Sequence, residues 1–450
     1  MINSELIKKY NVAAPRYTSY PTVPYWQTEL WTEAKWLKTV QKSYIQTAEV
    51  GISLYIHLPF CESLCTYCGC NTRITKNHAV ELPYVEAVLK EWDMYREHLA
   101  ERPKIKEIHL GGGTPTFFSA ENLKMLLERL LEKAEVAEGA EFSFEAHPAN
   151  TTLEHLETLY KLGFRRLSLG VQDFDPKVQE IINRKQSVEQ VREVTDNARK
   201  LGYTSINYDL IYGLPLQKQS SVIDTINKVN ALKPDRIAFY SYAHVPWIKP
   251  GQRRFTEADL PEDEEKRALY EIGREMFLQA GYYDIGMDHF ALETDSLYKA
   301  EQTQSLHRNF MGYTHQFTQL SIGLGVSSIS DSWSGFAQNV KKLETYLGLI
   351  QTDTFPLMKG HILTDEDLSM RVHILNIMCK GTTSWLFEDR FDQSVIDRLK
   401  PLENDGLIEI HDDTLTITPI GKAFLRNICM AFDMRLWENK PESQLFSMAV

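Results

Sequence analysis

Residues 52–70 read ISLYIHLPFCESLCTYCGC, a short apolar run followed by a loop with four cysteines. An apolar run of this length that ends near a proline is typical of a buried strand. Cys61, Cys65, Cys68 and Cys70 follow that strand directly. In a barrel of parallel strands, the loops after the strands form the catalytic face. The stretch therefore predicts a strand of a sheet and a thiol site at its C-terminal end.

The same order of strand and helix repeats along the chain. Strand-like runs lie at Ile52–Phe60, Ile105–Gly113, Glu141–Pro148, Arg165–Gln172, Ser205–Pro215 and Arg236–Pro246. Helix-like segments lie between them at 82–100, 119–133, 151–163, 187–202 and 219–233. This alternation implies parallel βαβ units with right-handed crossovers. Six units predict an α/β fold with a partial TIM-type (β/α)6 barrel; a doubly wound sheet is the alternative, which periodicity does not separate from it.

We expect three consecutive parts in the chain. Residues 1–50 precede the first strand and would form an N-terminal lid segment, and residues 51–360 would form the barrel catalytic domain with its extension. Residues 361–450 would form a mainly helical C-terminal cap domain, with a helix at 392–404 and a small hairpin after it. This order also resembles a winged helix. The last part has 9 basic and 15 acidic residues, and a DNA-reading wing should be basic, so we favour the cap.

The composition excludes several classes of protein. The chain has 450 residues, with 49 basic against 61 acidic residues and a net charge of −12. This acidic balance argues against nucleic acid and anionic membranes as partners. A hydrophobic content of 43% with 24% charged residues is that of an ordinary globular protein. No run is long enough to span a membrane, and the polar N-terminus lacks the core of a signal peptide, so we expect a cytoplasmic protein.

The spacing of the cysteines predicts an iron–sulfur cluster. C-x3-C-x2-C lets Cys61, Cys65 and Cys68 reach three corners of a cubane cluster. The open fourth iron could then chelate S-adenosylmethionine and pass it an electron, which yields a 5′-deoxyadenosyl radical. The alternatives are a closed electron-transfer cluster or a structural zinc site with Cys70 or His57 as fourth ligand. Zinc sites usually pair two separated knuckles, and the sequence has no second one.

Other polar motifs follow the later strands. Gly111-Gly-Gly-Thr-Pro115 ends the second strand and is a candidate for binding the amino-acid end of S-adenosylmethionine. Glu145, Gln172, Asp209 and Ala243-His244 stand at the ends of the next four strands. In a barrel these side chains would converge on its mouth.

These motifs together resemble the radical S-adenosylmethionine superfamily and, over essentially the whole chain, its oxygen-independent coproporphyrinogen III oxidase family. Further motifs that carry the resemblance are Arg16-Tyr-Thr-Ser-Tyr-Pro21, Cys68-Gly-Cys70, Gly170-Val-Gln-Asp-Phe174, Asp209-Leu-Ile-Tyr-Gly-Leu-Pro215, Gly286-Met-Asp-His-Phe290, Leu306-His-Arg-Asn-Phe310 and Arg426-Asn-Ile-Cys-Met430. The heme-chaperone relatives of this family share the cysteine and GGTP motifs but typically lack the first two. A heme chaperone of the radical S-adenosylmethionine superfamily is the alternative.

The resemblance implies the residues of the site. Cys61, Cys65 and Cys68 would ligate one [4Fe-4S] cluster, and Cys70 would not. Two S-adenosylmethionine molecules would bind side by side. The one on the cluster would be contacted by Tyr55, Gly112, Glu145 and Ile329, and the second by Tyr67, Gly113, Thr114, Gln172, Arg184, Asp209 and Ala243. Tyr67 stands where this family commonly has a phenylalanine, and either ring could stack on a base.

The resemblance also implies the reaction. It is the anaerobic oxidative decarboxylation of two propionate side chains of coproporphyrinogen III to vinyl groups, which gives protoporphyrinogen IX. An electron donor and an acceptor, both unidentified, would be the other partners, and we expect a monomer. Since the substrate is a polyanion and the chain has a charge of −12, basic residues must gather locally. Arg16, next to two tyrosines, is a candidate for binding and covering the substrate.

Overall fold

The structure is a computed structural model that describes residues 4–385, 393–441 and 445–449. The chain forms two compact units. The barrel unit consists of Thr28–Tyr283 and Thr318–Ile362, and the cap unit consists of Met1–Gln27, Asp284–Phe317 and Leu363–Val450. Both units combine separate stretches of chain. The sequence predicted three consecutive parts with boundaries at residues 50 and 360, and that division stays a prediction.

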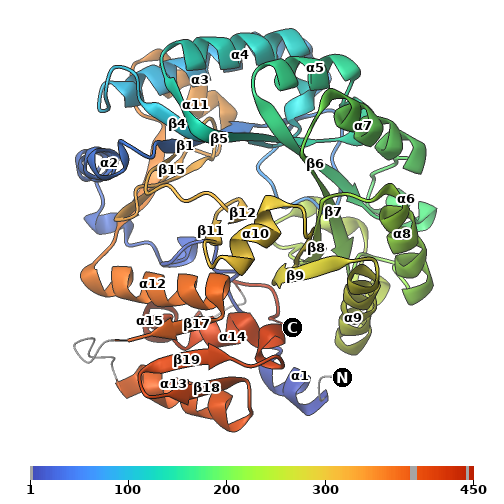
Figure 1. The fold of residues 1–450 in the computed structure, drawn as a ribbon. Coiled ribbons are helices and arrows are strands. Elements are labelled where there is room, and N and C mark those ends of the chain that lie inside the picture. The colour runs from blue at the N-terminus through green and yellow to red at the C-terminus, as the bar shows by residue number, and fades with distance from the viewer. Residues whose placement is uncertain (1–3, 386–392, 442–444, 450) are drawn as a thin grey trace. The chain divides into compact units, whose positions relative to one another are not determined.

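Six parallel strands of the barrel unit pair in chain order, as predicted (Figure 1). They are β1 (Ile52–Leu58), β4 (Lys104–Gly112), β5 (Glu135–Ala146), β6 (Phe164–Gln172), β7 (Ser205–Tyr212) and β8 (Arg236–Ser241). A helix follows each strand: α3 (Glu81–Arg96), α4 (Ala120–Glu132), α5 (Leu153–Lys161), α6 (Pro176–Ile181) with α7 (Val188–Leu201), α8 (Gln219–Leu232) and α9 (Asp263–Gln279). The partial (β/α)6 barrel is thereby confirmed.

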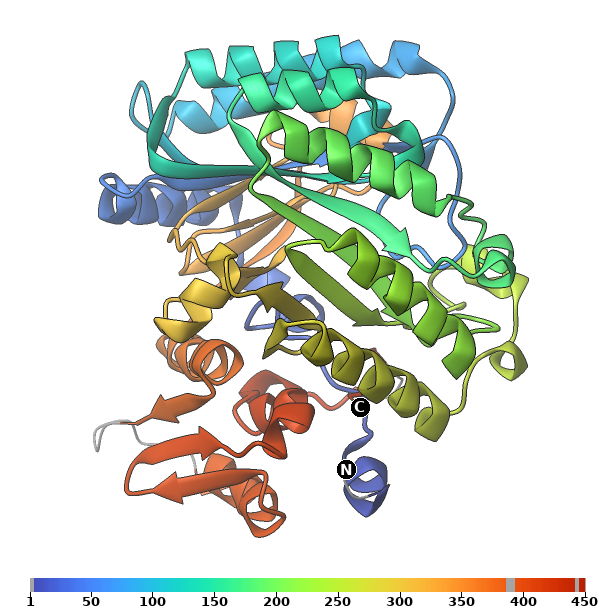
Figure 2. The same ribbon diagram turned by 45° about the vertical axis from the view of Figure 1, so that its right-hand side comes forward.

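The pattern of apolar residues explains how these helices pack. In α4, Leu123, Leu126, Leu127 and Leu130 recur at helical spacing and are completely buried. The Ser119 side chain accepts a hydrogen bond from the Asn122 amide at 3.2 Å and caps the helix start. Figure 2 shows the helices of this unit along the outer face of the curved sheet. The C-terminal ends of the strands therefore stay open for a site.

The sheet continues beyond the six predicted strands. β13 (Ser321–Leu324) pairs parallel with β1, and the antiparallel strands β14 (Ile329–Asp331), β15 (Gly335–Asn339) and β16 (Leu357–Ile362) follow it. The unit also contains α2 (Glu33–Thr47), α11 (Leu343–Gln351) and the short pair β2 (Phe60–Cys61) and β3 (Arg73–Ile74). β9 (Tyr282–Gly286) leads the chain out of the barrel unit.

The cap unit is mainly helical, as predicted. Its helices are α1 (Ser4–Tyr10), α10 (Ser296–Gln302), α12 (Asp365–Lys380), α13 (Gln393–Asn404), α14 (Leu425–Met430) and α15 (Met434–Glu438). Its strands are β10 (His289–Leu292), the hairpin β11 (His307–Asn309) and β12 (Gly312–Thr314), and a small sheet of β17 (Thr382–Ser384), β19 (Thr414–Ile417) and β18 (Ile408–His411). The helix expected at 392–404 and the hairpin after it are present, with Asp392 outside the described residues.

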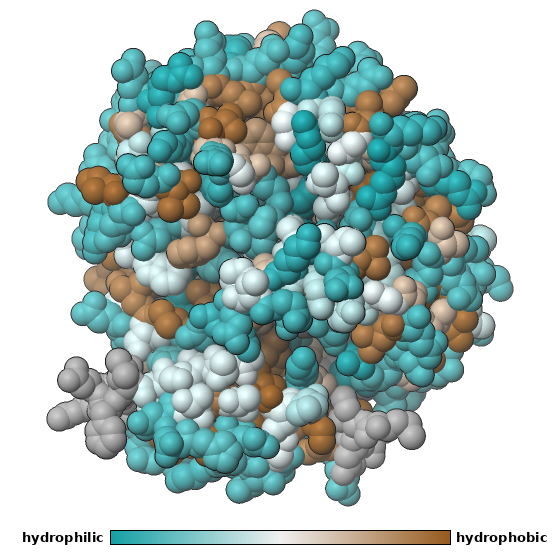
Figure 3. All heavy atoms as spheres, in the orientation of Figure 1, coloured by the Kyte–Doolittle hydropathy of each residue, from teal (hydrophilic) through white to brown (hydrophobic). Residues whose placement is uncertain are grey.

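Among the residues that the structure describes, no helix combines the length and the apolar content that a bilayer crossing requires. Figure 3 shows the hydrophobic side chains of one face as small groups among hydrophilic ones. Scattered apolar groups of this kind are normal on a protein surface.

Candidate functional site

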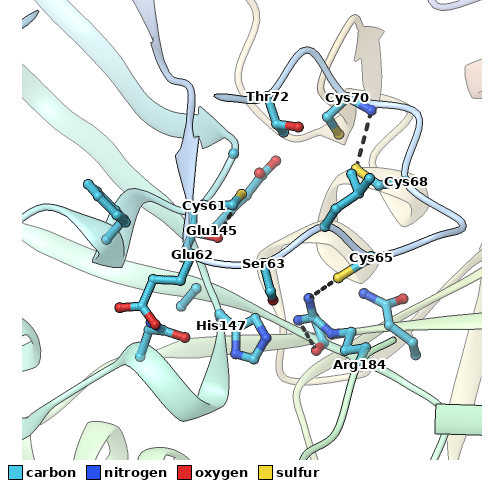
Figure 4. A pocket seen from close by; sticks show the side chains of 18 of the residues that line it. Cys61, Glu62, Ser63, Cys65, Cys68, Cys70, Thr72, Glu145, His147 and Arg184 are labelled. Carbon is cyan, nitrogen blue, oxygen red and sulfur yellow. Dashed lines mark hydrogen bonds between the residues drawn. The ribbon is translucent and has the colours of Figure 1, made fainter. Parts of the chain in front are cut away.

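A cavity of about 520 Å³ lies at the C-terminal ends of the strands in the barrel unit (Figure 4). Its walls come from the cysteine loop after β1 and from the ends of β4, β5, β6 and β7. This is the place where barrel enzymes have their active sites. The side chains that line it decide its chemistry.

All four clustered cysteines line this cavity. Cys61, Cys65 and Cys68 are half-buried and Cys70 is exposed, and all four are free thiols. The Cys70 thiol and amide donate to Cys68, and these hydrogen bonds lower the pKa of Cys68 to about 6. Burial raises the pKa of Cys61 to about 11, and coordination to a metal would remove that proton. The assignment of Cys61, Cys65 and Cys68 as ligands stays a prediction.

The other thiol contacts come from outside the loop. The Arg184 guanidinium donates from Nη1 to Cys65 Sγ at 3.6 Å, and Thr114 Oγ1 lies 3.3 Å from Cys61 Sγ. Both donors are suited to stabilising thiolate sulfur. In Figure 4 the Cys65 thiol points toward the Arg184 guanidinium, and the Cys68 thiol points toward the Cys70 amide. The chemistry of this donor set fits an iron–sulfur cluster.

His57 does not fit the zinc alternative. Its Nε2 donates to the Asn71 carbonyl at 2.9 Å, so its Nδ1 accepts from the Tyr55 hydroxyl at 3.1 Å. Burial lowers the pKa of His57 and keeps it neutral. Both ring nitrogens are thereby engaged within the protein. Across the described part of the chain, no three His, Cys, Asp or Glu side chains converge as the ligands of a single ion do.

The glycines at the end of β4 are needed because other parts of the protein pack closely against them, and not only because they line the cavity. Gly112 has a φ of +112°, and a Cβ there would lie 2.7 Å from the His57 ring. A Cβ on Gly113 would lie 2.6 Å from the Pro59 carbonyl oxygen. The Gly113 amide donates to the Leu58 carbonyl at 2.8 Å, so the two strand ends are joined. The glycines therefore fix the start of the cysteine loop and also line the cavity.

Glu145 contributes a negative charge at the end of β5. Its carboxylate accepts from the Gly112 amide at 3.2 Å and from His109 Nε2 at 3.5 Å. Burial acts to raise the pKa of Glu145, but these donors outweigh it and hold the pKa below its usual value. The ionised carboxylate can accept hydrogen bonds from an ammonium group in the cavity.

Three further polar residues line the cavity: Gln172 on β6, Asp209 on β7 and Arg184 in the loop between α6 and α7. Asp209 accepts from Ser168 and Asn207, each at 2.8 Å, and burial raises the pKa of Asp209 to about 6. Gln172 has a left-handed backbone with a φ of +65°. Arg184 donates from Nη2 to the Gly170 carbonyl at 2.6 Å, while its buried Nε has no partner. An unpartnered buried donor next to a cavity indicates a bound group.

Most of the expected contact residues line one cavity. Those that do are Tyr67, Gly112, Gly113, Thr114, Glu145, Gln172, Arg184 and Asp209. Tyr55, Ala243 and Ile329 are not among its lining. The Tyr55 ring stacks on His109 with centroids 6.0 Å apart, and Ile329 pairs with Gln338 between β14 and β15. The Ala243 carbonyl accepts from Gln252 Nε2 at 3.2 Å.

The cavity also holds residues that the sequence did not single out as contacts. His147, Ser168, Asn183 and Lys185 are among them. Burial lowers the pKa of His147 to about 3, so it is neutral, and its Nδ1 accepts from the Ala149 amide at 3.1 Å. One signal pointed to it, because it stands two residues after Glu145 at the same strand end.

Arg16, the candidate for binding the substrate, belongs to the cap unit. Its guanidinium donates from Nη1 to Asp288 Oδ2 at 2.8 Å, and both side chains are mostly buried. Part of its charge is therefore compensated within the protein. Its role toward a substrate stays a prediction.

Comparisons with known proteins agree on one family. Residues 55–229 match the model of the radical SAM superfamily. The oxygen-independent coproporphyrinogen III oxidase of Synechocystis sp. is 37% identical over 100% of this chain and 98% of its own. The enzyme of the same name from Escherichia coli is 37% identical over 99% and 98%. The solved structure of coproporphyrinogen III oxidase from E. coli, described as a radical SAM enzyme, superposes with a TM-score of 0.90 at 36% identity and covers 96% of this chain and 99% of its own.

Proposed function

Because this chain belongs to the oxygen-independent coproporphyrinogen III oxidase family of the radical SAM superfamily, we propose that it converts coproporphyrinogen III to protoporphyrinogen IX without oxygen. The observation that carries the proposal is the similarity over the full length, together with three half-buried thiols at the open end of the barrel. Each of two propionate side chains would lose a hydrogen atom, CO2 and one electron and become a vinyl group. The electron must leave to an acceptor, which is unidentified.

The cluster and the cofactor would be held by the residues of the cavity. When bound, a [4Fe-4S] cluster with S-adenosylmethionine supplies the 5′-deoxyadenosyl radical that removes hydrogen from an unactivated carbon. We assign its ligands as Cys61, Cys65 and Cys68. Cys70 is more exposed and its amide donates to the Cys68 sulfur. We therefore propose that Cys70 donates a hydrogen bond to a ligand and is not itself a ligand.

The polar residues of the cavity fit the charged groups of S-adenosylmethionine. The ionised Glu145 would accept from the ammonium group of the molecule on the cluster. Arg184, with its free Nε, would donate to a carboxylate of the second molecule, and Asp209 would accept from a hydroxyl group. Tyr55, Gly112 and Ile329 would complete the first set, and Tyr67, Gly113, Thr114, Gln172 and Ala243 the second. The shared cavity of eight of these residues supports the assignment.

The activity is tested by product analysis. Anaerobic protein with dithionite, S-adenosylmethionine and coproporphyrinogen III should form the divinyl product and release two CO2 for each substrate. Cys61→Ala should form neither. Tight heme binding without a vinyl product would indicate the heme-chaperone alternative. Zinc without iron in anaerobically purified protein would contradict the proposal at its first step.

The partners beyond the substrate are proposed in outline only. The reaction needs a one-electron donor for the cluster and an acceptor for the electron left by decarboxylation. We propose that the chain works as a monomer in the cytoplasm. Sedimentation of the purified holoprotein would test the first part, since a dimer would have twice the mass of 52.0 kDa.

A further inference from the structure

The cap unit contains two arginines of equal burial and unequal hydrogen bonding. Arg426 exposes 6% of its surface and Arg308 exposes 5%. The Arg426 guanidinium donates to four backbone carbonyls, those of Ala14, Pro15, Ser447 and Met448. Arg308 donates only from Nη2, to the Arg16 carbonyl at 3.4 Å, and its Nε and Nη1 have no partner. The buried guanidinium of Arg308 therefore makes one long hydrogen bond, and two of its three nitrogens have no hydrogen-bond partner.

Arg308 also packs against an aromatic ring. Its guanidinium carbon lies 4.6 Å from the centre of the Tyr313 ring, a cation–π contact. The Tyr313 hydroxyl donates to the Met378 carbonyl at 2.8 Å, which fixes the ring on α12. A buried cation with two unused donors is costly unless an anion completes it. Because the Tyr313 ring is fixed, it holds the Arg308 guanidinium in one orientation, in which an anion could bind to its unpartnered nitrogens.

The protein supplies no carboxylate for Arg308 among its described residues. Two acids lie in this neighbourhood: Asp288 already binds Arg16 at 2.8 Å, and Asp433 accepts from the Tyr17 hydroxyl at 3.0 Å. Arg308 and Asp288 both lie close enough to Tyr313 to act on its pKa, in opposite directions. His307, the preceding residue, is uncharged because burial and the Arg371 charge lower its pKa to about 3. The Nε and Nη1 of Arg308 thus have no carboxylate partner among the described residues.

We propose that Arg308 binds a propionate carboxylate of the substrate through its unpartnered guanidinium donors. The inference rests on the proposed function, because that function brings a ligand with four carboxylates to a chain whose net charge is −12. Arginine binds carboxylates with geometric specificity and stays charged at every relevant pH. Arg308 acts as a substrate-binding residue, and the Tyr313 ring and the Arg16 carbonyl orient it.

The test is a binding measurement that needs no turnover. Full-length holoprotein is mixed anaerobically with coproporphyrinogen III or with its tetramethyl ester, which has the same ring and no carboxylates. After ultrafiltration, the free ligand is oxidised and measured by its porphyrin absorbance. Wild-type protein should prefer the acid. Arg308→Gln should bind the acid about tenfold or more weakly and the ester as before, because one charge-assisted contact is lost.

Two further variants keep the test decisive if Arg308→Gln folds poorly. Arg308→Lys keeps the charge but lacks the planar donors, and its preference for acid over ester should fall several-fold. Arg253→Gln removes an exposed arginine of the barrel unit and should leave both affinities at the wild-type value. Circular dichroism of each variant shows whether it is folded.

The outcomes separate this inference from the proposed function. If wild-type protein does not bind coproporphyrinogen III, the proposed function fails. If it binds acid and ester equally, or if Arg308→Lys keeps the wild-type preference, the carboxylate site is overturned while the function stands. If Arg308→Gln weakens acid and ester alike, Arg308 has a structural role only and the inference is again overturned.

Discussion

At the scale of single residues, the burial of Asp209 gives the site a pH dependence. Its pKa is raised to about 6 from 3.8, chiefly by burial, while Ser168 and Asn207 donate to it. The folded protein therefore binds this proton more tightly than the unfolded chain does. Stability from this group is complete below about pH 4 and is lost as the pH rises through 6. Above that pH the carboxylate is charged and can accept hydrogen bonds from a ligand.

Asp209→Asn should remove this dependence. Relative to the variant, wild-type protein should lose roughly 2 kcal/mol of unfolding free energy between pH 4 and 7, because the pKa shift is about two units. Urea unfolding at a series of pH values measures it. Asp353→Asn, whose side chain is 77% exposed, is the control and should follow the wild type. Parallel curves for Asp209→Asn and wild type would contradict the raised pKa.

The four clustered thiols differ in what they should contribute to the cluster. Cys61→Ala, Cys65→Ala and Cys68→Ala should each lose most bound iron. Cys70→Ala should keep about four iron atoms for each chain, because three thiolates suffice for an open cubane cluster. Iron and sulfide analysis after anaerobic reconstitution measures this. Equal iron in Cys61→Ala and Cys70→Ala would show that the ligand assignment is wrong.

At the scale of elements, the cysteine loop depends on the strand beside it. The Gly113 and Thr114 amides donate to the Leu58 and Phe60 carbonyls at 2.8 and 3.0 Å. His57 then fixes the far side of the loop through its hydrogen bond to the Asn71 carbonyl. The loop is thus held at both ends by β1 and β4, so small changes outside it should disturb the cluster.

Gly113→Ala tests this support. A Cβ would lie 2.6 Å from the Pro59 carbonyl and push the start of the loop away. We expect a loss of roughly 2–4 kcal/mol in stability and a several-fold loss of iron after reconstitution. The matched control is Gly69→Ala, since nothing lies within 4 Å of a Cβ there. Full iron content in Gly113→Ala would argue against the support.

The sequence predicted those elements whose own pattern is strong. β1, β4, β5, β6, β7 and β8 are long apolar runs with amphipathic helices between most of them, and C-x3-C-x2-C is a local spacing. β14 and β15 were not predicted, because they have only three and five residues. A run this short does not show a pattern that distinguishes a strand from a loop. The contacts of Gly113 and His57 were also not predicted, because they join residues that are far apart in the sequence. Only the folded sheet brings those residues together.

At the scale of the whole molecule, Arg426 connects both ends of the chain. Its guanidinium binds the carbonyls of Ala14 and Pro15 near one end and of Ser447 and Met448 near the other. Ala14 also donates to the Ser447 carbonyl at 3.1 Å. The segment that contains Arg16 is therefore positioned by residues more than four hundred positions away.

Arg426→Gln should release both segments. A glutamine cannot satisfy four carbonyls, so we expect a loss of roughly 2–4 kcal/mol in stability. Trypsin should then cleave after Arg16 about tenfold faster, and mass spectrometry of timed digests measures this. Arg253→Gln is the control: it lacks the tryptic site at residue 253, but it should be cleaved after Arg16 at the wild-type rate. An unchanged cleavage rate at Arg16 would show that other contacts hold the segment.

The interleaved make-up of the two units sets an order for their formation during synthesis. Every residue of the barrel unit has been translated once Ile362 is added, whereas the cap unit still lacks Leu363–Val450. Domains tend to fold as they emerge from the ribosome. The cysteine loop can therefore receive its iron before Arg426 exists to gather the chain ends. Until then, the cap unit, which contains Arg16 and Arg308, cannot fold completely. The nascent protein would therefore form its cofactor site before its proposed substrate-binding site.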